Sequence, residues 1–341
     1  MEGKDPSQLL HRAASCGIEF IPTCQKHIGS DRLSGVIQRF KQNLINQGVI
    51  FRLQTKVDDI LVEEGRSWGV RIGNRRLPAD SIILSPGGSG STWLHRIATR
   101  YGILFHHQPL DVGVRVEVPS VCYEEAIKIN WDPKFRMRTP SYDDLVRTFC
   151  TNPNGLVIRE KYFEAEGVNG HALYANRSEN TNFALLARIS LTEPVEDTSA
   201  YGTSISQLAH TIGGGVPIIQ RLEDLKQGRR STWNRILHSH VTPTLQAVTP
   251  GDISMALPHR IVTDIEERLE MLDRVIPGVA SGAMILYAPE IKFASLRIVT
   301  EPSLETRIRN LYVAGDGAGL SRDIINAAAT GLIAADHILA S

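Results

Sequence analysis

The sequence predicts an α/β fold from three segments that share one pattern. In each, a short apolar stretch lies next to glycines: residues 30–54, residues 79–91 and residues 310–335. The first and the last also contain a helical repeat. Buried strands that run into glycine loops beside amphipathic helices are typical of parallel α/β sheets. The composition is that of a globular chain, because 42% of the 341 residues are hydrophobic and 22% are charged.

The N-terminal part of the chain predicts two helices and a strand. A short helical pattern covers Ser7–Ser15. Ser30 and Asp31 begin a second helix, in which apolar residues recur every three or four positions until Gly48 ends it. The apolar run in residues 48–54 then predicts a buried strand, which completes a helix-to-strand step.

Residues 56–84 predict a small antiparallel meander followed by a buried strand. The three alternating runs, at residues 56–62, 68–72 and 75–77, are separated by the turn pairs Glu64-Gly65 and Gly73-Asn74. The apolar residues 81–84 then lead into Pro86-Gly87-Gly88-Ser89-Gly90-Ser91. The glycines of this loop allow a ligand or another backbone to approach closely.

The middle of the chain has a different texture and predicts an inserted α+β domain. Strand-like runs cover residues 112–118 and 184–191, and helical patterns cover residues 216–226 and 259–275. We therefore predict two domains. Residues 1–104 and 291–341 form a discontinuous α/β domain, and residues 105–290 form the inserted one.

The C-terminal segment returns to the α/β pattern. Residues 310–314 predict a strand, residues 315–319 a tight turn, and Ser321 the cap of an alanine-rich helix. This arrangement places backbone N–H groups and the positive end of a helix at one point, which favours an anion or an electron-rich carbonyl. Asp316 adds an acceptor suited to a sugar or polyol hydroxyl. In the alternative interpretation the segment is a plain strand-to-helix turn, and Asp316 accepts hydrogen bonds only from backbone N–H groups.

The stretch Leu-Tyr-Val-Ala-Gly-Asp-Gly-Ala-Gly, followed by Ile-x-x-Ala-Ala-x-x-Gly-x-x-Ala-Ala, resembles the C-terminal FAD motif of two-dinucleotide-binding-domain flavoproteins. The resemblance implies a Rossmann-like FAD-binding domain in which the aspartate binds a ribityl hydroxyl and the following helix points at the N1/C2 carbonyl edge of the flavin. A T-x-V pattern and the strand-to-glycine element at residues 79–88 add two residues to the implied site. The implied FAD-binding residues are Val57, Gly87, Gly315, Asp316, Gly317, Ala318, Gly319, Ile324 and Ile325.

Several further patterns are similar to a subgroup described as FAD-dependent dehydrogenases or FAD-dependent proteins. They are His27-Ile28-Gly29-Ser30-Asp31-Arg32-Leu33, Gly113-Val114-Arg115-Val116-Glu117, Thr148-Phe149-Cys150, Val168-Asn169-Gly170, and Gly215-Val216-Pro217 with Gln220-Arg221 and Asp224. The resemblance covers nearly all of the chain from residue 7 onward. It implies an FAD-dependent oxidoreductase, a dehydrogenase acting on a small molecule. The sequence identifies neither the substrate nor a catalytic acid or base.

The chain departs from that family near its N-terminus. The family opens with a strand, a G-x-G-x-x-G loop and a helix, and the first 80 residues contain no such motif. Without those central strands, a sheet has an unpaired edge and exposed apolar faces. We therefore interpret the chain as an N-terminally truncated flavoprotein, from a gene fragment, a misassigned start or a split gene. The alternative to an FAD-dependent oxidoreductase is a fragment that is non-catalytic or partner-dependent and does not bind FAD alone. Alternatively, another polypeptide supplies the missing strands.

Two further departures concern the implied flavin environment and a cysteine motif. Arg322-Asp323 stands where the subgroup has Gly-Gly, and a carboxylate at Asp323 would oppose negative charge on a reduced flavin. Cys150 lacks the second cysteine that follows in the subgroup. We therefore expect Cys150 to be a small buried residue without dithiol chemistry.

Charged residues in and after the inserted domain leave alternatives open. Arg115 and Glu117 share one face of a predicted strand, where they line a substrate pocket or form a structural ion pair. Glu290, Lys292 and Arg297 lie on the segment that enters the last strand. By analogy with the family, that segment approaches the substrate side of the flavin.

Composition and residue spacing exclude several classes of protein. The 37 basic and 37 acidic residues balance, which argues against a dedicated nucleic-acid or anionic-membrane binder. No apolar run approaches the roughly 20 residues of a transmembrane helix. Four widely spaced cysteines argue against a disulfide scaffold and favour the cytoplasm. No metal site is predicted, because the histidine pairs at 106/107 and 238/240 have no acidic or cysteine partner close in sequence.

Overall fold

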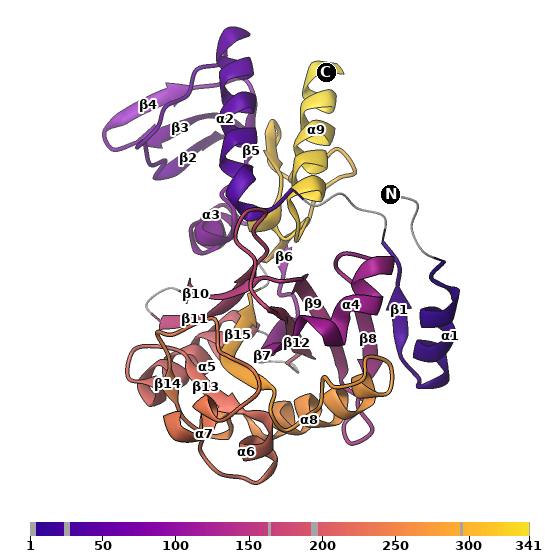
Figure 1. The fold of residues 1–341 in the computed structure, drawn as a ribbon. Coiled ribbons are helices and arrows are strands. Elements are labelled where there is room, and N and C mark those ends of the chain that lie inside the picture. The colour runs from indigo at the N-terminus through magenta and orange to yellow at the C-terminus, as the bar shows by residue number, and fades with distance from the viewer. Residues whose placement is uncertain (1–4, 24–27, 163–164, 192–196, 294–295, 341) are drawn as a thin grey trace. The chain divides into compact units, whose positions relative to one another are not determined.

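The computed structural model describes residues 5–23, 28–162, 165–191, 197–293 and 296–340 (Figure 1). The chain divides into two compact units. The larger unit comprises Met1–Leu44, Leu110–Ile189 and Ala200–Lys292, and the smaller unit comprises Ile45–Pro109, Ser190–Ser199 and Phe293–Ser341. Helices and strands occur in both units, and the predicted α/β fold class is confirmed.

An eight-stranded sheet forms the framework of the larger unit, with the strand order β1-β8-β9-β12-β7-β15-β13-β14. Neighbouring strands are antiparallel, except that β13 and β14 are parallel. The strands are β1 (Glu19–Ile21), β7 (Leu110–Pro119), β8 (Lys134–Arg138), β9 (Leu145–Asn152), β12 (Asn180–Ile189), β13 (Ile218–Arg221), β14 (Thr249–Pro250) and β15 (Ile285–Lys292). A hairpin of β10 (Leu156–Tyr162) and β11 (Ala165–His171) packs on this sheet through β11.

Strand β7 lies inside the sheet and is buried on both faces. Valines occupy positions 112, 114, 116 and 118, and Asp111, Gly113, Arg115 and Glu117 occupy the positions between them. Because side chains alternate between the faces of a strand, one face of β7 is apolar and the other contains buried charges. This second face is covered by β11, since Gly170 of β11 lies against the guanidinium of Arg115.

Seven of the described helices lie wholly or mostly in this unit. They are α1 (Ser7–Ser15), α2 (Ser30–Asn46), α4 (Ser120–Ile129), α5 (Thr198–Gly213), α6 (Leu222–Lys226), α7 (Trp233–Leu237) and α8 (His259–Asp273), and a 3₁₀ turn covers Ile253–Met255. Two of them, α2 and α5, cross a unit boundary at one end. Helix α8 packs against β7, β9 and β12 through Ile261, Ile265, Leu269 and Leu272. Their spacing of three and four residues forms one apolar stripe.

The smaller unit combines three small sheets with two helices. Strands β2 (Asp59–Glu63), β3 (Arg66–Ile72) and β4 (Arg75–Pro78) form an antiparallel meander, β5 (Ile82–Leu84) pairs in parallel with β17 (Leu311–Val313), and β6 (Phe105–His106) pairs with β16 (Arg297–Ile298). The helices are α3 (Ser91–Tyr101) and α9 (Ile324–Ala340), with 3₁₀ turns at Gly88–Gly90 and Asp316–Ala318. The core joins β5, β17, α3 and the meander through Ile60, Ile82, Leu84, Leu94, Ile97, Ala98, Ile103, Ile298, Ile308, Leu311, Val313 and Ala318.

Several predicted elements are confirmed within a few residues. These are the helices at Ser7–Ser15 and Ser30–Asn46, the meander, and the strands β5 and β17. The turn pairs of the meander have the expected backbone, with positive φ at Glu64, Gly65 and Gly73.

Three local predictions are wrong. Residues 48–54 form no strand; their apolar side chains are exposed, and no described strand lies beside them to supply a ladder. Residues 216–226 are not one helix, because Ile218 and Ile219 belong to β13, which pairs with both β14 and β15. Ser321 does not cap α9. That helix starts at Ile324, and the carboxylate of Asp323 accepts from the Asn326 backbone N–H at 2.8 Å.

Candidate functional site

Two glycine loops meet at the carboxyl ends of the parallel strands β5 and β17. The loops follow directly on the strands, and a Cβ placed on Gly317 would lie 2.4 Å from the carbonyl oxygen of Gly87. Gly87 and Gly315 have φ of 68° and 77°, which side chains other than glycine rarely allow. Both loops therefore require glycine, Gly317 for space and the other two for backbone conformation. In open α/β sheets, ligands bind outside the carboxyl ends of the strands.

Asp316 lies between these loops with its carboxylate available to a ligand. The side chain is half-buried, and a Cβ on Gly88 would lie 3.1 Å from its Oδ2. No described residue donates a hydrogen bond to this carboxylate, whose pKa is raised by burial and lowered in part by the charge of Arg322. The backbone carbonyl, in contrast, accepts from the Gly319 N–H at 2.8 Å and so closes the turn. Among the described residues, the backbone of Asp316 closes the turn, and its side chain accepts no hydrogen bond within it.

Gly319 and Ser321 lie at and just after the C-terminal end of the same turn. The Gly319 carbonyl accepts from Gln108 Nε2 at 3.0 Å, and a Cβ on Gly319 would meet that nitrogen at 2.3 Å. The Ser321 hydroxyl is buried and has no hydrogen-bond partner among the residues described. A buried hydroxyl without a partner is unfavourable unless a water or a ligand satisfies it.

The start of α9 differs from a bare helix N-terminus. Asp323 accepts from both the backbone N–H and the side-chain Nδ2 of Asn326, so its carboxylate caps the helix. Ile324 and Ile325, two of the implied FAD-binding residues, are 65% and 77% exposed at this point. They contribute no packing to the core of the smaller unit.

Val57 lies apart from these loops in the sequence, in the segment just before β2. It is half-buried. The carbonyl of its neighbour Asp58 accepts from Trp93 Nε1 at 3.0 Å and from Arg96 Nη2 at 3.1 Å, which holds this segment beside α3. The assignment of Val57 and of the other residues to FAD stays a prediction.

A second polar cluster occupies the buried face of β7 in the larger unit. Arg115 is fully buried and donates from Nε to Glu290 Oε2 at 2.6 Å and from Nη2 to Glu290 Oε1 at 2.5 Å. Nη1 donates to the Cys150 carbonyl and to Asn182 Oδ1, and Nη2 also donates to Asn169 Oδ1. All five N–H bonds of the guanidinium are thus matched by acceptors.

This cluster brings together three sequence patterns that are far apart in the chain. Arg115, Cys150 and Asn169 each belong to one of the patterns quoted from the subgroup. The glycine after Asn169 is required by space, because a Cβ on Gly170 would lie 2.2 Å from Asn182 Oδ1 and 2.7 Å from Arg115 Nη1. The patterns therefore encode one buried network.

Arg115 and Glu117 do not pair with each other, and each has other buried partners within the protein. Arg115 pairs with Glu290 rather than with Glu117. Glu117 accepts from the Thr244 hydroxyl at 2.6 Å and the Tyr287 hydroxyl at 2.5 Å, and burial raises its pKa. Neither side chain is exposed, so they support the sheet and do not line an open pocket.

The other charged residues of the same segment have separate roles. Lys292 Nζ lies 3.2 Å from Glu290 Oε1 and 3.1 Å from Glu160 Oε2, which extends the network toward the surface. Arg297, in the smaller unit, lies with Nη1 3.4 Å from the Gly319 carbonyl. Of these residues, Arg297 is therefore the one that reaches the glycine-loop site.

Cysteines and histidines form no reactive cluster in the part of the chain that the structure describes. Cys16, Cys122 and Cys150 are free thiols. Cys150 is half-buried rather than buried as predicted, because it sits at φ 49° at the irregular end of β9. No group of three possible metal ligands occurs among the described residues; His27, from the first subgroup pattern, lies outside them.

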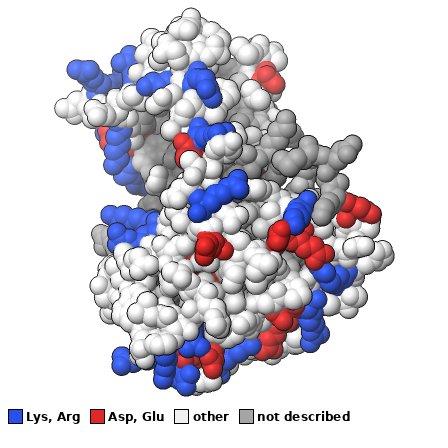
Figure 2. Space-filling view, in the orientation of Figure 1, with Lys and Arg blue, Asp and Glu red and all other residues white. Residues whose placement is uncertain are grey.

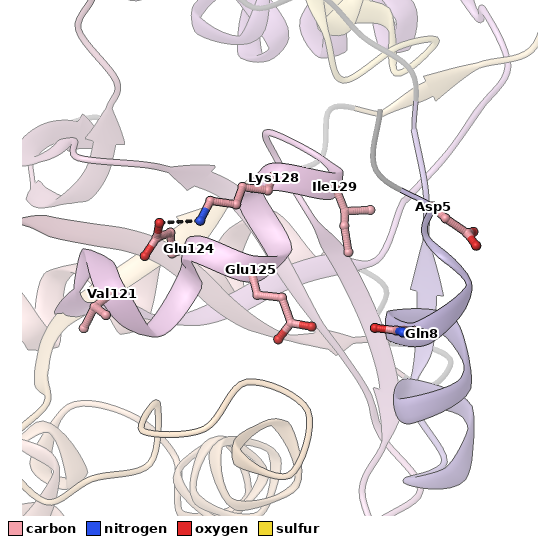
Figure 3. Close-up of a pocket in the computed structure, with 7 residues that line it drawn as sticks. All are labelled: Asp5, Gln8, Val121, Glu124, Glu125, Lys128 and Ile129. Atoms are coloured by element: carbon pink, nitrogen blue, oxygen red, sulfur yellow. Dashed lines mark hydrogen bonds and ion pairs between the residues drawn. The ribbon is translucent and has the colours of Figure 1, made fainter. Parts of the chain in front are cut away.

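The visible face of the molecule carries charges of both signs (Figure 2), and no membrane-spanning helix occurs among the described residues. Figure 2 shows basic and acidic side chains interspersed over the visible face of the molecule. A groove of about 340 Å³ between α1 and α4 carries Glu124 and Glu125, and Lys128 pairs with Glu124 (Figure 3). Arg12 pairs with Glu125. Among the described helices, none is both long and apolar enough to cross a bilayer.

Fold and site together define an α/β protein with a strand–glycine loop–helix element in one unit and a large, mostly antiparallel sheet in the other. Residues 109–292, more than half of the chain, match the family described as "FAD-dependent protein, C-terminal domain-like". The chain belongs to this family of FAD-dependent proteins. The match covers the Arg115 network and ends at Lys292, so it includes none of the glycine-loop residues.

The relatives of the chain are distant. An uncharacterized protein of Clostridium beijerinckii is 25% identical over 359 aligned positions, which cover 97% of this chain and 64% of that protein. The chain thus spans less than two thirds of this curated relative. An oxidoreductase from Methanosarcina mazei is 13% identical, with a TM-score of 0.38, over 89% of this chain and 54% of that one. The protein CtdE, crystallised with FAD, is also 13% identical, with a TM-score of 0.27, over 92% and 62%.

Proposed function

We propose that the chain is part of an FAD-dependent oxidoreductase, a dehydrogenase, and that its glycine-loop site holds the ribityl–pyrophosphate part of FAD. The observation that supports this most is the Asp316 carboxylate, which is half-buried between two glycine loops and has no donor among the described residues. Its acceptor oxygens suit the hydroxyls of a ribityl chain. The absence of side chains at Gly87, Gly315 and Gly317 leaves the backbone accessible to a cofactor.

The residues around Asp316 extend the proposed contact. The orphan hydroxyl of Ser321 can donate to an oxygen of the cofactor and so gain the partner that it lacks. Asp323 is less favourable, because its carboxylate caps α9 where the flavin edge would lie. Bound FAD would transfer the hydride, and these side chains would position it. The substrate would be a small molecule.

The test is a visible absorption spectrum of the purified chain after incubation with FAD and gel filtration. Retained flavin bands are expected for the unaltered chain and for Asp80→Asn, an exposed aspartate of the same unit. Asp316→Asn is expected to release most of the flavin. Equal retention by both variants would show that the flavin binds elsewhere.

A second proposal, partner dependence, is favoured by apolar surface in the smaller unit. Helix α9 is strongly apolar, yet Ala334 is its one buried residue, and Leu332 and Leu339 are 67% and 85% exposed. Parallel strands are normally covered on both faces, but Ile83 in the middle of β5 is exposed. We infer that another polypeptide covers these faces before the chain binds FAD.

This second proposal predicts a colourless chain that gains flavin on assembly. The chain is coexpressed with the part of the Clostridium beijerinckii relative that it does not match. Flavin bands that appear only in the copurified complex would support partner dependence, and flavin retained by the isolated chain would refute it.

A further proposal concerns the cellular compartment of the protein. Three free thiols in the described residues suit a reducing, cytoplasmic environment.

A further inference from the structure

A pocket of about 300 Å³ in the larger unit is lined by three arginines. It lies beside α8: Arg268 belongs to the helix, Arg274 follows its last residue, and Arg138 comes from the end of β8. Glu267 and Glu270 also reach this pocket. It belongs neither to the glycine-loop site nor to the Arg115 network, and every residue in it is part of one unit.

Arg268 is a buried cation that the protein leaves incompletely satisfied. It is 1% exposed, and its Nε has no hydrogen-bond partner among the described residues. Nη1 contacts only the Met271 sulfur, at 2.6 Å, and Nη2 lies 4.0 Å from Glu267 Oε2, beyond hydrogen-bond reach. Arg115, the other fully buried arginine, satisfies all of its N–H bonds. A buried charge without full pairing raises the free energy of the folded state, and an anion bound next to Arg268 would lower it.

The carboxylates around the pocket are engaged elsewhere. Glu270 forms an ion pair with Lys226 at 2.7 Å, and Glu267 accepts from the Ser141 hydroxyl. Asp264, one helical turn before Arg268, is buried with both oxygens unpartnered. Burial raises its pKa to about 7, so it carries only part of a negative charge near neutral pH.

The remaining arginines add positive charge on the open side. Arg274 is exposed and forms no ion pair among the described residues. Burial lowers the pKa of Arg268, and the charge of Arg274 lowers it further. Arg138 is paired with Asp143 at 3.1 Å. Two neighbouring guanidinium groups therefore lie at one cavity without a full counter-charge.

We propose that this pocket is a binding site for an oxyanion, a phosphate or carboxylate group held between Arg268 and Arg274. Guanidinium groups match both anions through paired N–H donors, and such charge-assisted bonds are among the stronger ones in proteins. The cavity is larger than the anion itself. It therefore has room for a small metabolite that carries the anionic group.

The test is isothermal titration of the full chain with inorganic phosphate and, separately, with acetate, each against chloride at matched ionic strength. Binding of either oxyanion is expected to weaken about tenfold in Arg274→Met, which removes one exposed guanidinium without touching the core. Arg136→Met is the matched control, because Arg136 is half-exposed and makes only a 3.9 Å contact with Glu19.

The possible outcomes distinguish binding of phosphate, binding of a carboxylate and no specific binding. A preference for phosphate or for acetate, lost in Arg274→Met and kept in Arg136→Met, supports the site and identifies its group. Equal heats for chloride and both oxyanions would overturn it, as would unchanged binding in Arg274→Met. Arg268→Met provides a second variant, for which a gain in thermal stability together with loss of binding is expected, since it removes an unsatisfied buried charge.

Discussion

Arg115 and Asp316 are both charged groups placed beside glycines, but they stand in opposite situations. Arg115 lies in the larger unit with every N–H bond donated to a protein acceptor. Asp316 lies in the smaller unit, half-buried, with no described donor to its carboxylate. A buried charge that the protein satisfies supports the fold. A charge that it leaves unsatisfied, next to backbone that only glycine can form, indicates a place for a ligand.

The largest expected effect comes from breaking the satisfied network. Arg115→Met should lower the free energy of unfolding by about 3–5 kcal/mol, because it leaves Glu290 buried with only Lys292 nearby. Urea unfolding measures this loss. The double variant Arg115→Met/Glu290→Leu should be the more stable of the two, since it removes both charges.

A surface pair supplies the control for this prediction. Lys128→Ala breaks the exposed pair with Glu124 and should change the unfolding free energy by no more than about 0.5 kcal/mol. If Arg115→Met were as mild as Lys128→Ala, the network would not be the support that its hydrogen bonds indicate.

The next effect tests whether the network depends on its glycine. Gly170→Ala places a Cβ within 2.2–2.7 Å of Asn182, Asn152 and Arg115, and should cost about 2–3 kcal/mol through overpacking. Denaturant unfolding with tryptophan fluorescence measures it. Gly35→Ala, in α2 with nothing within 4 Å of its Cβ, should be neutral or should stabilise by roughly 0.5–1 kcal/mol. A similar change in both variants would contradict the close packing.

Asp264, another buried ionisable residue of the larger unit, should make the free energy of unfolding depend on pH. Burial raises its pKa to about 7 and outweighs the opposing effects of the Thr139 hydroxyl and the charge of Arg260. The folded protein therefore holds a proton that the unfolded chain releases. The stability from this proton is complete below the ordinary carboxyl pKa and is lost as the pH rises through about 7.

Between pH 5 and pH 8 this loss should be on the order of 2 kcal/mol. Thermal unfolding across that range measures it, and Asp264→Asn should flatten the profile. The neighbouring Asp144 titrates on the acid side, because Arg260 lowers its pKa, and does not contribute in this window. Asp143→Asn, at an exposed aspartate, should leave the slope unchanged. A persistent slope in Asp264→Asn would assign it to another group.

How much the sequence predicts differs between the two units for a physical reason. The strand–glycine loop–helix segment at residues 310–335 is local, so its pattern predicts β17, the turn and α9. The helix start is misplaced by two residues, because Asp323 rather than Ser321 caps the helix. The strand predicted at residues 48–54 fails because a strand needs a neighbour, and apolar periodicity alone does not supply one.

The Arg115 network, in contrast, cannot be predicted from local sequence patterns. Its members come from β7, β9, β11, β12 and β15, and sequence spacing cannot place them together. Periodicity correctly puts Arg115 and Glu117 on one face of a strand, but the partner, Glu290, is 175 residues away. Arg268 gives no signal either, since a single arginine on the apolar stripe of an amphipathic helix resembles a surface residue until its burial is known.

The smallest expected effect on stability concerns Asp316. If no protein donor uses its carboxylate, Asp316→Asn removes a partly buried charge without breaking a hydrogen bond, and the free energy of unfolding should stay within about 0.5 kcal/mol or rise slightly. Affinity for FAD should nevertheless fall about tenfold, the effect of one lost charge-assisted hydrogen bond. Fluorescence titration with FAD and urea unfolding of the same samples measure the two quantities. Should Asp316→Asn destabilise the protein as Arg115→Met does, the carboxylate would have a structural partner and the contrast between the two residues would not hold.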